Sequence, residues 1–502
     1  MKPVRWKSLL VLLAVLGLGL PAQAHVGSKD IFEQVSAGPY QLFVTIRPPN
    51  VIPGVAVIEA RASGVSGNSP VTAIRITPTP LTGEAANHPP SPDAMERSAD
   101  DPAFFTGSLW LMAPGSWQVR FEVDGAAGKA STSVPVPAMP LSILPMDKPL
   151  GTLLGALGAL LVLGIAAIVA AAVRESRLAP GLAAPEQPRT ALTAGAATLL
   201  LAAGAVALGG WWWNAEASGY ARAIYHPLRL SPSLSGNTLD LKISSEDETR
   251  DKDRRRAASL RSNADLLPDH GHLMHLYAIR QPGMDAVFHL HPAPATAGDL
   301  RMTLPSMPPG VYALYGDIVH ANGFPETLTA TLTIPPTLPP SALAADDASA
   351  LPPPLDHGDL GPSYSLPDGY TMVWERPAAL TASTAYAFRF HLLDPAGKPA
   401  TDMQPYLGMA GHAAFVKADG TTFAHTHPNG SAAMAAVELA NGASPTEMDT
   451  GSMSGMDMTA QPTAPTVEFP YGFPSPGRYR VCIQMKHGHT VETGVFDAEV
   501  HP

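Results

Sequence analysis

The sequence predicts a mainly β protein, in which three tandem Ig-like antiparallel β-sandwich domains accompany a two-helix transmembrane hairpin. Short runs that alternate apolar and polar residues recur along the chain, and turns separate them, with 53 prolines and 44 glycines among 502 residues. Two longer runs are continuously apolar. Parts of two β regions also repeat one another. These three features together predict the architecture.

The first 24 residues have the pattern of a secretory signal peptide. A basic stretch precedes an apolar run, and Ala22 and Ala24 supply the small residues of a cleavage site. Cleavage after Ala24 would make His25 the first residue of the mature chain. The alternative is an uncleaved anchor, for which the apolar run is short.

The predicted transmembrane hairpin consists of residues 150–173 and 191–213. Neither run contains a charged residue, and each is long enough for a helix to cross a hydrocarbon layer of ~30 Å. The connecting loop, residues 174–189, contains three arginines, and the positive-inside rule places such a loop in the cytoplasm. We therefore expect a multi-pass protein of the inner (cytoplasmic) membrane, with most of its mass in the periplasm.

Outside the hairpin, the alternating runs form three predicted sandwiches, residues 25–140, 219–336 and 363–502. A segment rich in proline and alanine, residues 337–362, is the predicted linker between the second and the third. The one cysteine, Cys482, excludes an intrachain disulfide, so each domain depends on its core. The formal net charge of −11 offers no overall basic field for nucleic acid.

An internal repeat relates the second and third sandwiches. Residues 309–320 align without a gap on residues 476–487, and both segments begin with Pro-Gly and end with histidine. Upstream of each segment, a single histidine precedes a His-x-His pair, whereas the N-terminal sandwich has no such pair. This repetition indicates two related domains with a shared histidine pattern.

In the third sandwich, the histidine pattern predicts a cluster on one face of a hairpin. Asp419-Gly420 is a strong signal for a type I′ turn. That turn pairs residues whose numbers sum to 839, so His412 should lie opposite His427, with His425 diagonal to it. Residues two apart in a strand point to the same face, so all three imidazoles should be neighbours.

The second sandwich reaches the same arrangement through a different turn. A three-residue loop, residues 282–284, would pair His275 with His291, with glycine available for a left-handed position. His289 then lies on the same face. Two unrelated turns that preserve one histidine pairing favour a site that binds a transition metal ion.

The histidines that end the aligned segments, His320 and His487, are the candidates for a fourth ligand in each domain. A surface pair or a satisfied polar ladder is the alternative reading of a His-x-His in a strand. Because free imidazole has a pKa near 6.5, such sites should release their ions below pH ~6. The eight candidate metal ligands are His275, His289, His291, His320, His412, His425, His427 and His487.

A methionine-rich segment interrupts the third sandwich among glycine, serine and acidic residues. Thioethers are soft ligands that favour Cu(I), and they need no deprotonation. The alternative is a low-complexity loop that happens to contain methionine. The possible soft-metal ligands are Met448, Met453, Met456 and Met458.

The mature N-terminus offers one more possible copper site. An N-terminal His25 can chelate Cu(II) through its amine and its ring, as in a histidine brace. Completion of a brace needs a second histidine, and His88 lies in the same domain within a proline-rich loop. An ordinary exposed terminus is the alternative.

The hairpin-plus-strand domains resemble the small extracytoplasmic sandwiches called YtkA-like or FixH-like, and more loosely the sandwiches of copper carriers. The methionine run is similar to the Met/Asp-rich stretches of periplasmic copper-resistance proteins, although it lacks their histidines. The resemblance implies a role in the cell envelope linked to a metal, with copper as the first candidate. It carries over no catalytic residue.

We therefore expect a membrane-anchored extracytoplasmic protein that binds copper, or alternatively zinc, for metal tolerance, storage or delivery. Its partners would be the metal ion and envelope proteins of copper handling or oxidase assembly. A second hypothesis is a structural or interaction module of Ig-like sandwiches with incidental histidines. A third is a metal-dependent envelope enzyme with a carboxylate base such as Asp317, but the sequence contains no nucleophile elbow, His-Glu-x-x-His motif or phosphate loop.

Overall fold

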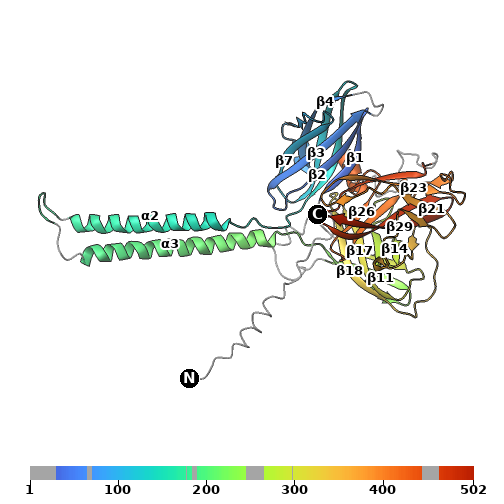
Figure 1. The fold of residues 1–502 in the computed structure, drawn as a ribbon. Helices are drawn as coiled ribbons and strands as arrows, with labels where there is room; N and C mark the ends of the chain where they lie inside the picture. The colour runs from blue at the N-terminus through green and yellow to red at the C-terminus, as the bar shows by residue number, and fades with distance from the viewer. Residues whose placement is uncertain are drawn as a thin grey trace. The chain divides into compact units, whose positions relative to one another are not determined.

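The computed structural model describes residues 30–64, 70–176, 178–183, 189–244, 265–296, 298–443 and 463–502. They form a mainly β protein with several antiparallel sheets, as predicted (Figure 1). The chain divides into two compact units, one of residues 140–225 and one of residues 1–139 with 226–502. The predicted signal peptide, residues 1–24, lies outside the described residues.

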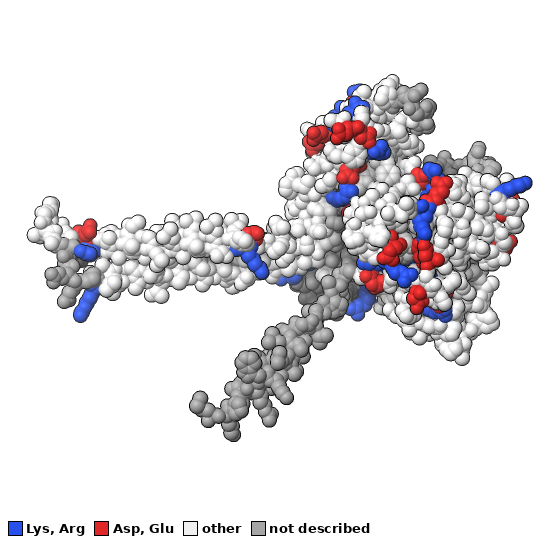
Figure 2. All heavy atoms as spheres, viewed as in Figure 1, with Lys and Arg blue, Asp and Glu red and all other residues white. Residues whose placement is uncertain are grey.

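The smaller unit is a pair of antiparallel helices, α2 (Lys148–Glu175) and α3 (Arg189–Arg222). The Asp147 side chain caps α2 by accepting a hydrogen bond from the Leu150 N–H (2.9 Å). Both helices are long and apolar enough to cross a membrane, with mean hydropathies of 2.7 and 2.0 in their most apolar windows. Between the ends of the helices, their visible face carries no charged side chain (Figure 2). Helix α3 runs beyond the predicted span and through residue 219, where the second sandwich was expected to begin.

Residues 30–139 form two sheets around one apolar core. The strands alternate inward and outward, so Leu42, Val44 and Ile46 of one strand are all buried. A 3-10 turn, η1 (Glu84–Asn87), lies between β4 and β5. One sheet has the order β1 (Ile31–Ala37), β2 (Tyr40–Arg47), β3 (Gly54–Gly64), β7 (Phe104–Leu111), β6 (Glu96–Arg97), and the other β5 (Asp93–Ala94), β4 (Val71–Pro80), β8 (Gly115–Gly125), β9 (Gly128–Ala138).

Residues 226–350 form a second pair of sheets around a second core. A four-stranded sheet has the order β10 (Arg229–Ser235), β11 (Thr238–Ser244), β16 (Asp299–Thr303), β15 (Ala293–Thr296). The facing sheet, here called the first histidine sheet, has the order β12 (Leu266–Leu267), β17 (Gly310–His320), β13 (His275–Gln281), β14 (Val287–Leu290), β19 (Ala348–Ala350), with β18 (Pro325–Ile334) on β17. Strand β19 lies inside the predicted linker, where it pairs with the edge of β14 and supplies that edge with hydrogen-bond partners.

Residues 363–502 form a third pair around a third core. A four-stranded sheet has the order β20 (Ser363–Ser365), β21 (Thr371–Trp374), β23 (Tyr386–Leu393), β27 (Thr466–Tyr471). The second histidine sheet has the order β22 (Leu380–Thr381), β29 (Thr490–His501), β28 (Gly477–His487), β25 (His412–Lys417), β26 (Phe423–Thr426), with β24 (Met403–Gln404) on β28. A short 3-10 helix, η2 (Leu355–His357), precedes this region, and a short helix, α5 (Met434–Ala440), lies within it.

The two histidine sheets are buried on both faces because they pack against each other. In β13, Leu276 and Ala278 face the second core, whereas Tyr277 and Ile279 belong to a further core shared by both histidine sheets. In β25, Phe415 faces the third core and its neighbours face the shared one. This shared core, here called the central layer, consists of Tyr277, Ile279, Met284, Val287, Tyr315, Ala350, Leu355, Ala414, Val416, Phe423, Cys482 and Val495.

Both predicted hairpin registers are confirmed, although the turn chemistry differs. Strands β25 and β26 pair Ala413 with Thr426, a sum of 839, and β13 and β14 pair Leu276 with Leu290, a sum of 566. The type I′ prediction for the first of these turns is wrong, because only Gly420 (φ 71°) has a positive φ and the Gly420 N–H bonds to the Lys417 carbonyl. In the other turn the left-handed residue is Met284 (φ 52°), not the glycine before it.

A buried arginine joins the two halves of the central layer. Arg480 of β28 is fully buried, and its Nε donates to Asp497 Oδ1 (3.0 Å). Its Nη1 donates across the layer to the carbonyl oxygens of Met284 (2.7 Å) and Pro353 (2.8 Å). The two bonds of Nη1 join residues that are more than a hundred positions apart, so they help to fix the stacking of the two histidine sheets.

We expect Arg480→Ala to lower the stability of the chain by about 3–5 kcal/mol, because it strands the buried Asp497 carboxylate. The thermal midpoint, followed by circular dichroism of the detergent-solubilised chain, should fall by roughly 3–6 °C. Arg389→Ala is the matched control, since Arg389 pairs with Glu468 but is half exposed; its midpoint should stay within about 2 °C. Equal midpoints for Arg480→Ala and the parent would contradict this role for Arg480.

Candidate metal centre

Eight histidine side chains from the two histidine sheets and one preceding turn meet at the edge of the central layer. Their neighbouring ring centroids lie between 4.2 Å (His272–His291) and 6.3 Å (His275–His412) apart. Six of the eight predicted ligands belong to this cluster, but as one group and not as one site per domain. The cluster consists of His270, His272, His275, His289, His291, His412, His425 and His427.

The alternation of side chains along a β-strand determines the face on which these histidines lie. His275 and His412 begin β13 and β25, and each starts the strand on the face that looks into the central layer. The registers then place each of them opposite the second histidine of a His-x-His pair, while the first histidine of the pair lies two residues back on the same face. The predicted facing arrangement within each hairpin is therefore present.

One group of three, here called the first triad, is His275, His289 and His291. One ring nitrogen from each lies within 4.8 Å of the others. The remaining nitrogen of each ring faces an oxygen, namely the Asp269 carbonyl (3.0 Å from His275 Nε2), Gln484 Oε1 (2.8 Å from His289 Nδ1) and Asp347 Oδ1 (3.1 Å from His291 Nδ1). Because these oxygens accept hydrogen bonds, the nitrogens that face them carry the ring protons.

The inward nitrogens of the first triad therefore present lone pairs. His275 Nδ1 and His289 Nε2 lie 3.1 Å apart, and His291 Nε2 is buried with no hydrogen-bond partner among the described residues. Two lone pairs at that distance repel each other unless a cation lies between them. Two nitrogens that each bind one ion at 2.0–2.1 Å in tetrahedral geometry would be about 3.3 Å apart.

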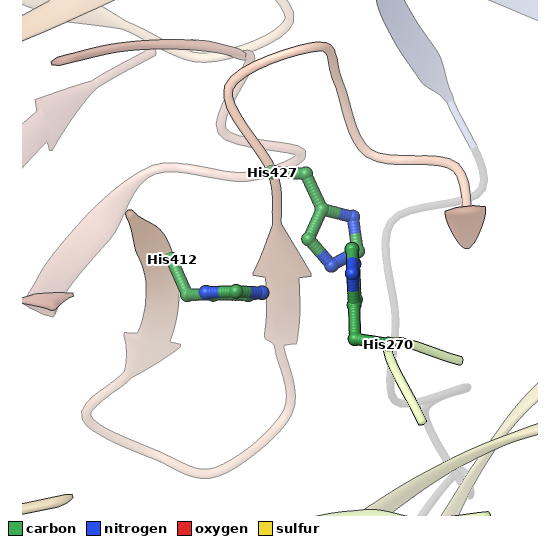
Figure 3. Close-up of side chains that lie close together, drawn as sticks. All are labelled: His270, His412 and His427. Atoms are coloured by element: carbon green, nitrogen blue, oxygen red, sulfur yellow. The ribbon is translucent and has the colours of Figure 1, made fainter. Parts of the chain in front are cut away.

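A second group of three, here called the second triad, is His270, His412 and His427 (Figure 3). The rings of His270 and His427 lie side by side, and the ring of His412 points towards them from the neighbouring strand. His427 Nδ1 faces the Ala432 carbonyl (3.3 Å), which leaves Nε2 free to coordinate. Within the described ranges, His270 Nε2, His427 Nε2 and both nitrogens of His412 are buried without a hydrogen-bond partner.

His425 lies between the two triads. Its ring centroid is 5.1 Å from that of His275 and 5.5 Å from that of His289 in the first triad. It is also 5.4 Å from His412 and 4.8 Å from His427 in the second. The eighth member, His272, packs against His291 (4.2 Å) at the solvent side of the cluster, where 24% of its side chain is exposed.

Burial keeps six of these imidazoles neutral, those of His275, His289, His291, His412, His425 and His427. Desolvation and neighbouring histidines lower the pKa of His275, His289, His412 and His425 well below the ordinary value. The same causes lower the pKa of His291 to about 3 and that of His427 to about 4. Neutral imidazole is the form that binds a metal ion, so the pH below which protons compete lies well under the pH ~6 expected from sequence.

The two proposed fourth ligands, His320 and His487, lie away from the cluster. His320 is buried between Glu326 (2.9 Å) and Asp265 (3.2 Å), which satisfy both of its ring nitrogens. It ends β17 three residues after Asp317, so it points to the opposite face of the strand.

His487 lies in a separate environment. It stacks on Tyr370 (3.9 Å between ring centroids) and pairs with Asp402 (3.2 Å) and Asp368 (2.8 Å). With Asp368 and Glu492 it forms a further group of possible ligand atoms, in which Asp368 is exposed. His88 is exposed at the end of η1, while His25 and the four methionines lie outside the described residues.

Sequence reasoning missed His270 and His272, although the repeat contains a signal for them. Pro268-Asp269-His270-Gly271 precedes β13 at the distance at which Pro405-Tyr406-Leu407-Gly408 precedes β25. Both turns contain two consecutive left-handed residues. In the first turn they are His270 (φ 53°) and Gly271, and in the second they are Leu407 (φ 49°) and Gly408. Each turn also reaches the opposite half, because His270 joins the second triad and Tyr406 O–H lies 3.3 Å from His289 Nδ1.

The ligand atoms that this cluster offers are almost all neutral imidazole nitrogens, which suit Zn, Cu, Ni and Fe. The Cys482 thiol lies in the central layer but outside both triads. Burial raises the pKa of this thiol to about 12, so it stays protonated and packs as an apolar residue. The oxygens that hold the outer ring nitrogens are the kind of partners that orient metal-binding histidines.

Comparison with known proteins gives one family and a set of distant folds. Residues 365–502 match a domain of unknown function, DUF8832. No curated protein matches the chain.

Among solved structures, the native conformation of alpha-2-macroglobulin from E. coli is 9% identical, with a TM-score of 0.21 and coverage of 96% of this chain and 23% of that one. A putative membrane anchored protein from Corynebacterium diphtheriae is 8% identical, with a TM-score of 0.15 and coverage of 94% and 96%. The ICAM-5 D1–D4 ectodomain fragment is 8% identical, with a TM-score of 0.15 and coverage of 92% and 77%. The chain thus spans about a quarter of the first of these proteins, and likeness at this level carries no argument about function.

Proposed function

We propose that this protein is a membrane-anchored extracytoplasmic protein that binds a transition metal, with copper as the first candidate and zinc as the second. Its role would be metal tolerance, storage or delivery. The observation that carries the proposal is the set of buried imidazole nitrogens that lack hydrogen-bond partners among the described residues, together with two triads whose ring nitrogens lie within 4.8 Å of one another. Where an oxygen holds the opposite ring nitrogen, as in the first triad and in His427, such nitrogens are typical of metal ligands.

The free-energy cost of burying ring nitrogens without hydrogen bonds favours metal binding over a purely structural role for the histidines. A buried polar atom without a partner costs ~1–3 kcal/mol. The cluster contains six such nitrogens among the described residues, on His270, His291, His412, His425 and His427. A structural module would gain stability if these positions were apolar, whereas a metal ion satisfies several of them at once.

Copper is preferred over zinc for reasons that come from the sequence. Imidazoles alone do not distinguish the two ions. The Met448–Met458 segment offers soft ligands, and the resemblance to YtkA-like, FixH-like and copper-carrier sandwiches points to copper. A metal-dependent enzyme is the third hypothesis; Asp317, whose pKa burial raises to about 7, would be its base.

The finer architecture belongs to the same proposal. Three tandem Ig-like sandwiches would lie outside the membrane, and α2 and α3 would form the transmembrane hairpin. The charges at the helix ends, the basic loop between the helices and the N-terminal signal pattern all favour this orientation.

The first prediction concerns metal content. The purified full chain should bind about two Cu(II) or Zn(II) ions, one for each triad. A variant with His289, His291, His412 and His427 all changed to Ala should bind none tightly, as measured by elemental analysis after dialysis. His391→Ala is the control, because His391 pairs with Glu375 outside the cluster. Parental metal content in the fourfold variant would refute the assignment.

The second prediction concerns pH. Because burial lowers the pKa of His291 to about 3 and those of His275 and His289 well below the ordinary value, protons should not compete with an ion in the first triad at pH 5.5. The Zn(II) affinity of the first triad should therefore change less than about threefold between pH 7 and pH 5.5. Three exposed histidines of pKa 6.5 would lose roughly 600-fold over the same range. A loss of that size, by competition with a chromophoric chelator, would mean that the ligands are exposed histidines.

The third prediction concerns topology. A reporter that is active only in the periplasm should be active when fused after Pro502 and inactive when fused after Pro180, in the loop between the helices. Activity of the Pro180 fusion would overturn the two-span arrangement.

A further inference from the structure

We propose that the two triads bind two metal ions in one dinuclear centre, with His425 as a ligand that either ion can take. The inference rests on the proposed metal binding and specifies it. Two independent sites, one per domain, would be the expectation from the repeat alone. The structure instead brings the two hairpins face to face, and each half supplies groups to the other.

The two triads are too close to be independent. Across them, ring centroids are separated by 6.0 Å (His270–His275), 6.2 Å (His289–His412) and 6.3 Å (His275–His412). An ion at 2.0–2.1 Å from each ligand nitrogen lies about 3 Å from the ring centroids, so the two ions would be at most about 12 Å apart. Two divalent cations at that distance interact strongly in a buried site.

His425 couples the two sites. Its Nδ1 faces Asp317 Oδ2 (3.4 Å), so it has one nitrogen, Nε2, for a metal. That nitrogen is buried and has no hydrogen-bond partner in the described part of the chain. Since the ring lies within 5.5 Å of members of both triads, it can be the fourth ligand of one ion or of the other, but not of both.

Each half of the site, residues 226–350 and residues 363–502, supplies groups that contact histidines of the other half. Asp317 of β17 in the first half faces His425 of β26 in the second. At the aligned repeat position, Gln484 of β28 in the second half accepts from His289 of β14 in the first. His270 of the first half likewise completes the second triad. Residues 365–502 therefore contain only two of the three ligands of that triad, and the centre exists only where the two histidine sheets are stacked.

The test is electron paramagnetic resonance of the detergent-solubilised full chain loaded with Cu(II), with the copper content measured in parallel. Two ions in one centre should give a dipole-coupled spectrum, seen as broadening of the normal Cu(II) signal with a half-field transition. His270→Ala should lower the content from about two ions to about one and should restore an isolated Cu(II) signal of full intensity. His289→Ala with His291→Ala should do the same from the other side, and His391→Ala should leave the coupled spectrum unchanged.

The possible results distinguish the dinuclear centre from metal binding itself. Two ions with uncoupled signals, or a single ion in the parent, would overturn the dinuclear centre while leaving metal binding intact. Two coupled ions in His270→Ala would show that His270 does not complete the second triad. If the parent binds no copper or zinc, the proposed function itself fails. His270→Gln, which keeps a polar side chain in the turn, serves in place of His270→Ala if the latter melts at a lower temperature than the parent.

Discussion

The arrangement depends on one constraint: the two histidine sheets are apolar on both faces, so each must be covered on both sides. Burial of side chains such as Tyr277, Val416 and Phe423 contributes roughly 1.5–3 kcal/mol each. This gain, with the bonds of Arg480 across the layer, offsets the cost of desolvating the imidazoles beside them. The histidines are buried together because their apolar neighbours on the same strand faces must be buried.

Burial of both faces of the histidine sheets also keeps most of the imidazoles neutral and leaves some of their nitrogens without hydrogen bonds. Exclusion of water lowers their pKa values and leaves lone pairs that point at each other, as at His275 and His289. In such a site a cation removes the repulsion and replaces the missing hydrogen bonds. The apo centre is therefore less stable than its apolar surroundings, and metal binding and the stacking of the two sheets should reinforce each other.

The sequence correctly predicted how residues pair within each hairpin, but it did not predict that the two hairpins pack against each other. The registers that oppose His412 with His427 and His275 with His291 followed from turn position and strand period, which are local. The stacking of the two hairpins depends on contacts more than a hundred residues apart, which no local pattern encodes. One signal was available: β13 and β25 read as continuous apolar runs, as strands buried on both faces do. His270 was missed because a turn residue has no periodicity, and His320 was misplaced because an odd spacing from Asp317 turns it to the other face.

The central claim is that buried imidazoles of both histidine sheets hold a transition metal, and X-ray absorption at the zinc edge of the Zn(II)-loaded full chain tests it most directly. The account predicts a first shell of three or four nitrogens at about 2.0–2.1 Å, with the outer-shell scattering of imidazole rings and no sulfur. A first shell of oxygens alone, or one with sulfur at about 2.3 Å, would contradict it.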